Sequence, residues 1–162
     1  MTLCTDTETA VIESIDESIN EVFEMMAGSA LNRIELEISE GQTESKNDIT
    51  VVMGLTGELQ GSLSLSMSRD GAFAWTKALI DHETSELDQT VIDAVGEMGN
   101  MVVGGAKRRL TDFVLTMSLP SVIHAGKDDI VFPTGSEPLA INYDYEGTVL
   151  AVMIALQRKT AL

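Results

Sequence analysis

Glu97 and Asn100 are the residues whose types and spacing are best suited to chemistry in this sequence. They lie in a stretch with helical periodicity, so a spacing of three residues places both side chains on one face. A carboxamide can accept from and donate to a water molecule without adding negative charge. Glu and Asn are also common on solvated helix faces, and that interpretation stands as the alternative to a functional site.

The same helical stripe carries Asp93, Gly104 and Arg108. Gly104 has no side chain, so it would let another molecule approach the turn beyond Asn100 closely. The opposite stripe is broad and apolar, as expected for a helix anchored on a core. Its members are Val91, Ile92, Val95, Met98, Val102, Val103, Ala106 and Leu110.

The helix is also rich in glycine, with Gly96, Gly99, Gly104 and Gly105 inside it. Each glycine costs about 1 kcal/mol relative to alanine in a helix interior. Such a helix needs close approach of its backbone, either to its own sheet or to a partner.

Three basic residues, Lys107, Arg108 and Arg109, follow the motif directly. Positive charge at this end compensates the dipole at a helix C-terminus. It could equally form a positive edge that receives an acidic partner. Both interpretations can hold together, and we treat Lys107 and Arg108 as candidate partner-binding residues.

The pattern Asp93-x3-Glu97-x2-Asn100 continues as Asn-Met-Val-Val-Gly-Gly-Ala-Lys and reaches Pro120 about twenty residues later. It resembles the chemotaxis phosphatases of the CheC, CheX and FliY group. In overall length, and in carrying one good motif, the chain is most similar to CheX. The resemblance extends over nearly the whole chain.

The resemblance implies a protein substrate, the phospho-aspartyl form of a CheY-like response regulator. Such a receiver holds its own Mg²⁺ and a lysine around the acyl phosphate, so no cofactor is expected on this chain. By resemblance, Asn100 would orient the attacking water, Glu97 would pair with the receiver's lysine, and Asp93 would support the motif. The alternative is an adaptor that docks a receiver or a flagellar-switch component without hydrolysis.

Composition limits the classes of binding partner and the cellular compartment that are expected. The net charge of −16 argues against nucleic acid and anionic membranes as partners. The longest apolar run, residues 149–156, is too short to span a bilayer, and the N-terminus has no export signal, so a cytoplasmic protein is expected. His82 and His124 have no metal-ligand spacing, and the single Cys4 excludes an internal disulfide.

The length and patterning predict a single α+β domain over residues 1–162, built from two related halves at about 6–68 and 82–158. An offset of 76 residues relates Glu17, Glu21 and Glu24 to the three motif residues. A carboxylate at position 24 would repel a phosphoryl group and could not donate to water, so we expect one site per chain.

Each half is expected to follow a helix with a strand and then a hairpin. Helices are predicted over residues 69–80, with Ser68 as N-cap, and from Ser85, with Asp88 as the acid of a capping box. Residues 42–48 and 127–138 read as loops. The predicted strands are 33–39, 49–56, 62–68, 113–119, 139–145 and 148–156.

In residues 113–119, the apolar Phe113, Leu115, Met117 and Leu119 alternate strictly with the other positions, which is typical of a half-buried strand. We therefore expect a sheet of about six mostly antiparallel strands, with the long helices on one face and a pseudo-twofold axis. The apolar last strand could be an edge or a centre of this sheet. An uncovered edge would pair with a second copy, and the family resemblance also implies a homodimer.

Overall fold

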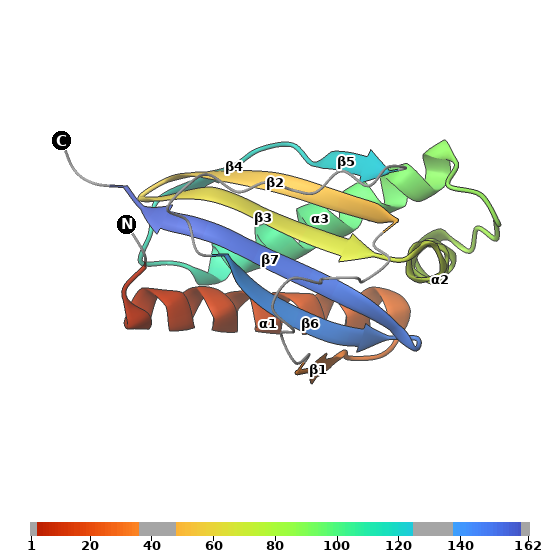
Figure 1. The fold of residues 1–162 in the computed structure, drawn as a ribbon, viewed down its shortest axis with the longest axis horizontal. Coiled ribbons are helices and arrows are strands. Elements are labelled where there is room, and N and C mark those ends of the chain that lie inside the picture. The colour runs from red at the N-terminus through yellow and green to blue at the C-terminus, as the bar shows by residue number, and fades with distance from the viewer. Residues whose placement is uncertain (1–2, 36–47, 125–137, 160–162) are drawn as a thin grey trace.

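The computed structural model describes residues 3–35, 48–124 and 138–159, which form three helices and a seven-stranded sheet (Figure 1). The helices are α1 (Thr5–Ala27), α2 (Arg69–Ile80) and α3 (Gln89–Arg109). The strands are β1 (Asn32–Ile34), β2 (Ile49–Gly57), β3 (Leu59–Met67), β4 (Leu115–Met117), β5 (Ser121–His124), β6 (Leu139–Tyr145) and β7 (Thr148–Arg158).

The order of the strands confirms the duplicated architecture. The sheet runs β1-β6-β7-β3-β2-β4, with β5 also paired to β2, and every pairing is antiparallel. Exchanging the first half (β1, β2, β3) with the second (β4 and β5, β6, β7) reverses this order and leaves the neighbours unchanged. A pseudo-twofold axis therefore passes between β3 and β7, and each half lends its first strand to the hairpin of the other.

The apolar last strand, β7, lies in the centre of the sheet between β3 and β6. It is therefore not an uncovered edge, and it cannot pair with a strand of a second copy. Among the described residues, the outer strands are β1 on one side and the β4–β5 pair on the other.

The helices begin close to the predicted positions, with one correction. Ser68 caps α2 as expected, because its hydroxyl accepts from the Gly71 backbone N–H. The second long helix does not start at Ser85. It starts at Gln89, with Asp88 as N-cap accepting from the Val91 backbone N–H at 3.0 Å. An N-cap aspartate satisfies the otherwise unpaired amides of the first turn, so the helix begins there.

The edge strands differ most from expectation. The segment 33–39 contributes only the short β1, and its part from residue 36 onward lies outside the described residues. Of the predicted strand over 113–119, only β4 (Leu115–Met117) forms. A further short strand, β5, begins beyond it at Ser121, was not predicted, and brings the sheet to seven strands instead of six. The predicted loops at 42–48 and 127–138 also fall outside the described residues, except for Asp48 and Pro138.

The long helices α1 and α3 lie side by side against one face of the sheet, and α2 lies near one of its ends (Figure 1). Alternate residues of the central strands point to this face and are fully buried, among them Val51 and Met53 of β2. The described residues include no helix long and apolar enough to cross a membrane.

Candidate active site

The helix that carries Glu97 and Asn100 is held by hydrogen bonds from both neighbouring helices. Trp75 of α2 donates its indole N–H to the Ala94 carbonyl at 2.8 Å, and Ser18 of α1 donates its hydroxyl to the Val102 carbonyl at 2.6 Å. Both donors are fully buried, where an unpaired polar group is costly. These two bonds flank the turns with Glu97 and Asn100, so the motif stands on a fixed backbone.

Internal packing explains two of the helix glycines. A Cβ on Gly99 would lie 2.7 Å from Val51 Cγ2, so only glycine lets α3 approach β2 this closely. A Cβ on Gly105 would lie 2.1 Å from the Ser18 Oγ, where α3 meets α1. The glycine content is therefore required by the helix's own sheet and its neighbouring helix, and it is not in itself evidence for a binding site.

The sequence suggested that Gly104 leaves space for another molecule, but a side chain of the protein itself lies there. A Cβ there would lie 3.7 Å from the Met117 methyl and 3.8 Å from an Arg108 nitrogen, which are ordinary contacts. Met117 of β4 already covers the turn. An external molecule could reach only the part of Gly104 that this side chain leaves exposed.

The motif side chains themselves lie at the surface. Asp93 and Glu97 are exposed, and Asn100 is half-buried. Asp93 accepts a hydrogen bond from Gln89, one turn earlier, at 2.8 Å. Within the described part of the chain, no group bonds to the Glu97 carboxylate or to the Asn100 amide. The two groups are therefore available to a partner.

A bend between β4 and β5 lies along α3 beside the turns that surround Asn100. Gly96 and Gly104 lie one turn before and one turn after it on the same side of α3. A Cβ on Gly96 would lie 3.8 Å from Pro120 Cγ, and one on Gly104 would lie 3.7 Å from Met117. Asn100 is thus placed next to the bend that joins Met117 to Pro120. The structure brings Pro120, which follows Asn100 by twenty residues in the sequence, to the helix turn before the motif asparagine.

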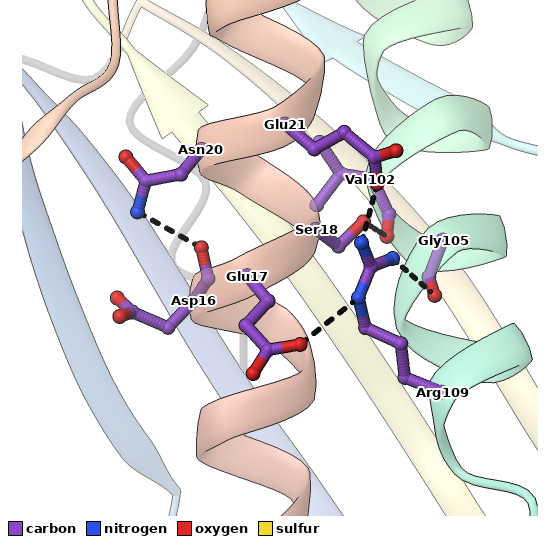
Figure 2. A network of polar contacts seen from close by, with 8 residues as sticks. All are labelled: Asp16, Glu17, Ser18, Asn20, Glu21, Val102, Gly105 and Arg109. Atoms are coloured by element: carbon purple, nitrogen blue, oxygen red, sulfur yellow. Dashed lines mark hydrogen bonds and ion pairs between the residues drawn. The ribbon is translucent and has the colours of Figure 1, made fainter.

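The three basic residues at the end of α3 divide into two roles. Arg109 pairs with Glu17 at 3.2 Å and with Glu21, and it donates to the Gly105 carbonyl, so it joins α3 to α1 (Figure 2). The hydrogen bond from Arg109 holds the pKa of Glu21 below its ordinary value. Lys107 is half-buried and Arg108 is exposed, and neither forms an ion pair with another described residue.

A second copy of the motif lies on α1, in a register that the sequence comparison missed. With an offset of 80, Glu13, Glu17 and Asn20 correspond to Asp93, Glu97 and Asn100. Residues 11–20 and 91–100 then match in being buried, half-buried or exposed at every position except one. The exception is Asp16, which is half-buried and corresponds to the buried Gly96. The earlier offset of 76 matched Gly28, which ends α1, to Gly104 inside α3. The burial pattern therefore replaces Glu21 and Glu24 with Glu17 and Asn20 as the counterparts.

Both ends of the Asn20 amide are bonded inside the protein. It donates to the Asp16 carbonyl at 2.9 Å and accepts from the Leu31 backbone N–H at 2.9 Å. The Asp16 carboxylate, at the position of Gly96, accepts from the Tyr143 hydroxyl at 2.7 Å. Glu17 is bound to Arg109 (Figure 2). The motif on α1 thus anchors the chain that enters β1, and the amide of Asn20 and the carboxylates of Asp16 and Glu17 are bonded to other residues of the protein.

The histidines lie apart from both motifs. His82 contacts Asp88, the N-cap of α3, with 3.1 Å between Nε2 and Oδ2, and His124 is exposed at the end of β5. Across residues 3–35, 48–124 and 138–159, no group of three or more His, Cys, Asp or Glu side chains is placed to hold a metal ion.

A family model described as chemotaxis phosphatase CheX matches residues 49–144, more than half of the chain. The chain belongs to the CheX family. The matched region begins at β2 and contains α3 with Glu97 and Asn100, whereas α1 lies before it. The family assignment therefore rests on a region that takes in β2 and β3 of the first half together with the helix that carries the exposed motif.

Similar proteins agree with this family. The CheY-P phosphatase CheX of Thermotoga maritima is 28% identical over 123 residues, covering 74% of this chain and 75% of that protein. The crystal structure of chemotaxis protein CheX from Vibrio vulnificus has the same fold, with a TM-score of 0.80 at 22% identity, over 91% of this chain and 96% of that one. A CheX–CheY–BeF3–Mg²⁺ complex from Borrelia burgdorferi matches with a TM-score of 0.77 at 23% identity, over 91% and 98%.

Proposed function

We propose that this protein is a phosphatase that hydrolyses the phospho-aspartate of a CheY-like response regulator. The observation that carries the proposal is the pair on α3, an exposed Glu97 and a half-buried Asn100 without partners among the described residues, on a helix fixed from both sides. The relative named CheY-P phosphatase and the similar protein solved with CheY support the same partner.

Asn100 would act by positioning water. A phosphorylated receiver carries its own Mg²⁺, which neutralises charge on the phosphoryl group, so the missing component is a nucleophile in line with the bond that breaks. The Asn100 amide can accept from a water and donate to it, and it adds no charge that would repel the phosphoryl oxygens. Holding the water in line makes attack on phosphorus effectively unimolecular. The P–O bond to the aspartate then breaks, leaving its carboxylate and inorganic phosphate.

Glu97 would act by docking. Its exposed carboxylate, one turn from Asn100, is suited to pair with the lysine beside the receiver's acyl phosphate. Asp93 lies one further turn away and would add to the negative side of the interface. Lys107 and Arg108 lie at the other end of the stripe, where they would meet acidic groups of the receiver. The charges along α3 thus fix the direction in which a receiver can dock.

The alternative is an adaptor that binds a receiver without hydrolysis. The feature that favours a phosphatase is the amide at position 100, because docking alone does not require a group that both donates and accepts. The contrast with α1 adds to this argument, since the amide of Asn20 at the equivalent position makes structural bonds at both its oxygen and its nitrogen.

The direct experiment measures phosphate release from purified receivers of the same genome, phosphorylated with a small-molecule donor in the presence of Mg²⁺. A phosphatase accelerates loss of the phosphoryl group from at least one receiver at catalytic amounts of the protein. An adaptor binds the phosphorylated receiver but leaves its rate of hydrolysis unchanged. Receivers are cytoplasmic domains, so the proposed reaction takes place in the cytoplasm.

A homodimer also remains a prediction. The central position of β7 removes that strand as a pairing edge, so a second copy would have to use another surface. Sedimentation velocity at micromolar concentration should give about twice the chain mass of 17.4 kDa. A single species of the chain mass would contradict the dimer without affecting the proposed chemistry.

A further inference from the structure

The bend beside Asn100 is a β-bulge. Pairing between β2 and β4 places Leu55 opposite Met117, and the Ser118 N–H donates to the Gly54 carbonyl at 2.9 Å. Pairing then resumes with Val52 opposite Ser121 in β5. Two residues, Leu119 and Pro120, therefore stand opposite the single residue Met53. A bulge of this kind bends the strand and turns side chains away from the regular alternation.

The bulge turns Leu119 out of the protein. Met117 and Pro120 on either side of it both contact α3, whereas the Leu119 side chain is 85% exposed. Regular alternation would have buried it with Phe113, Leu115 and Met117, so the expectation for this residue was wrong. Of the large apolar side chains in the described residues, Leu119 is the most exposed.

The exposed leucine is held on a rigid support. The Ser118 hydroxyl accepts from the Gly54 backbone N–H at 2.9 Å and donates to the Leu119 carbonyl at 2.9 Å. Pro120 fixes its own φ and restricts the residue before it. A backbone held in this way loses little freedom when a partner covers the side chain, and this lowers the cost of binding.

Leu119 also borders the candidate site. Its neighbour Pro120 packs at Gly96, one turn from Asn100, and Met117 packs at Gly104, one turn on the other side. A molecule that places a reacting group over Asn100 therefore lies against the bulge. The chain carries a net charge of −16, so a phosphorylated and acidic surface is repelled at long range. Contact energy at short range must offset that repulsion, and an apolar anchor supplies it.

We propose that Leu119 is the apolar anchor for the receiver domain, and that the β4–β5 bulge exists to present it beside Asn100. The inference rests on the proposed function, because it takes the receiver as the partner. It adds a contact that carries no charge and takes no part in the reaction. Leu119 thus contributes equally to binding before and during hydrolysis.

The test compares Leu119→Ala with Val114→Ala. Val114 is a matched control, since it is 78% exposed, apolar and placed at the opposite end of β4. For Leu119→Ala, the Kd for a receiver loaded with BeF3⁻ and Mg²⁺, and the KM for the phosphorylated receiver, should rise roughly tenfold to one-hundredfold. The kcat should stay near wild type, because the lost contact is uniform. Leu119→Met should restore most of the affinity, and Val114→Ala should leave Kd, KM and kcat unchanged.

Three other results would overturn the inference. Equal Kd and KM for Leu119→Ala and Val114→Ala would exclude the anchor while the proposed phosphatase activity stands. Conversion of a dimer to a monomer by Leu119→Ala, with receiver affinity unchanged, would assign the leucine to a second copy of the chain. If the wild-type protein neither binds nor dephosphorylates any receiver, the proposed function fails and the anchor fails with it.

Discussion

Asn20 on α1 and Asn100 on α3 occupy equivalent positions in the two halves, but the amide of Asn20 is bound within the protein, whereas that of Asn100 has no partner among the described residues. The Asn20 amide bridges the Asp16 carbonyl and the Leu31 N–H, which holds the chain leading into β1. At Asn100, the corresponding edge strand forms a bulge and leaves the amide accessible. One duplicated motif therefore serves structure in the first half and is available for chemistry in the second.

Removing the carboxylate of Glu97 should weaken both docking and rate. Glu97→Ala leaves the proposed lysine of the receiver without its partner, so KM should rise roughly tenfold or more, with a lower kcat. The measurement is steady-state phosphate release over a range of receiver concentrations. Glu97→Gln tests the charge: KM should then depend less on salt than in the wild type. An unchanged KM in both variants would exclude the docking role.

The acidic residues of α1 should have little effect on activity. Glu21 pairs with Arg109 at the surface, and an exposed pair of this kind contributes little to stability. Glu21→Ala and Glu24→Ala should retain phosphate release near the wild-type rate, with melting temperatures within a few degrees of it. A large loss of rate in either variant with the fold intact would place a second site on α1.

The glycines of α3 should respond to alanine in opposite directions. Gly99→Ala puts a methyl group 2.7 Å from Val51 Cγ2, and relief of this overlap should cost about 1–3 kcal/mol of unfolding free energy. Gly104→Ala meets Met117 at an ordinary 3.7 Å and should gain up to about 1 kcal/mol from helix propensity. Urea denaturation measures both. A stabilised Gly99→Ala variant would contradict the close packing of α3 on β2.

Gly104→Ala also tests the remaining role of that residue in partner binding. If a receiver uses the exposed part of Gly104, KM should rise although the protein becomes more stable. An unchanged KM would restrict Gly104 to internal packing and leave Asp93, Glu97, Lys107 and Arg108 as the docking residues on α3.

Acid should destabilise the protein partly through Asp88. The Val91 backbone N–H, and then His82, hold the pKa of Asp88 below its ordinary value in the folded state. A lowered folded pKa means that this contribution is complete above the unfolded pKa of about 3.9 and is lost as pH falls through the folded pKa. Thermal melts of the wild type and Asp88→Asn from pH 7 to 2.5 should converge at the acid end. If the melting temperatures of the two proteins instead fall in parallel with pH, ionisation of the Asp88 carboxylate does not contribute to stability.

Several elements could be predicted from the sequence because local patterns determine them. The apolar stripe of α3, the cap at Ser68 and the turn between β6 and β7 each depend on residues close together in the chain. The motif pair was predicted for the same reason, since a spacing of three on a helix fixes a shared face. The duplicated order of elements then gave the architecture of the sheet.

The β4–β5 bulge could not be predicted in this way. Residues 113–119 alternate without interruption, and the extra residue becomes visible only from the pairing with β2. The register of the internal repeat was also missed, because residue types favoured an offset of 76 whereas burial favours 80. Gly99 and Gly105 were open to two interpretations until Val51 and Ser18 were seen against them. In each case the deciding information is a contact between segments far apart in the sequence.

The most direct test of the proposed chemistry compares two asparagines. Asn100→Ala should leave the melting temperature near wild type, because its amide has no partner among the described residues, and should lower the rate of receiver dephosphorylation by about 10²–10³. Asn20→Ala should cost about 1–2 kcal/mol of stability through the unpaired Leu31 N–H, with the rate retained. Wild-type turnover in Asn100→Ala would contradict the account.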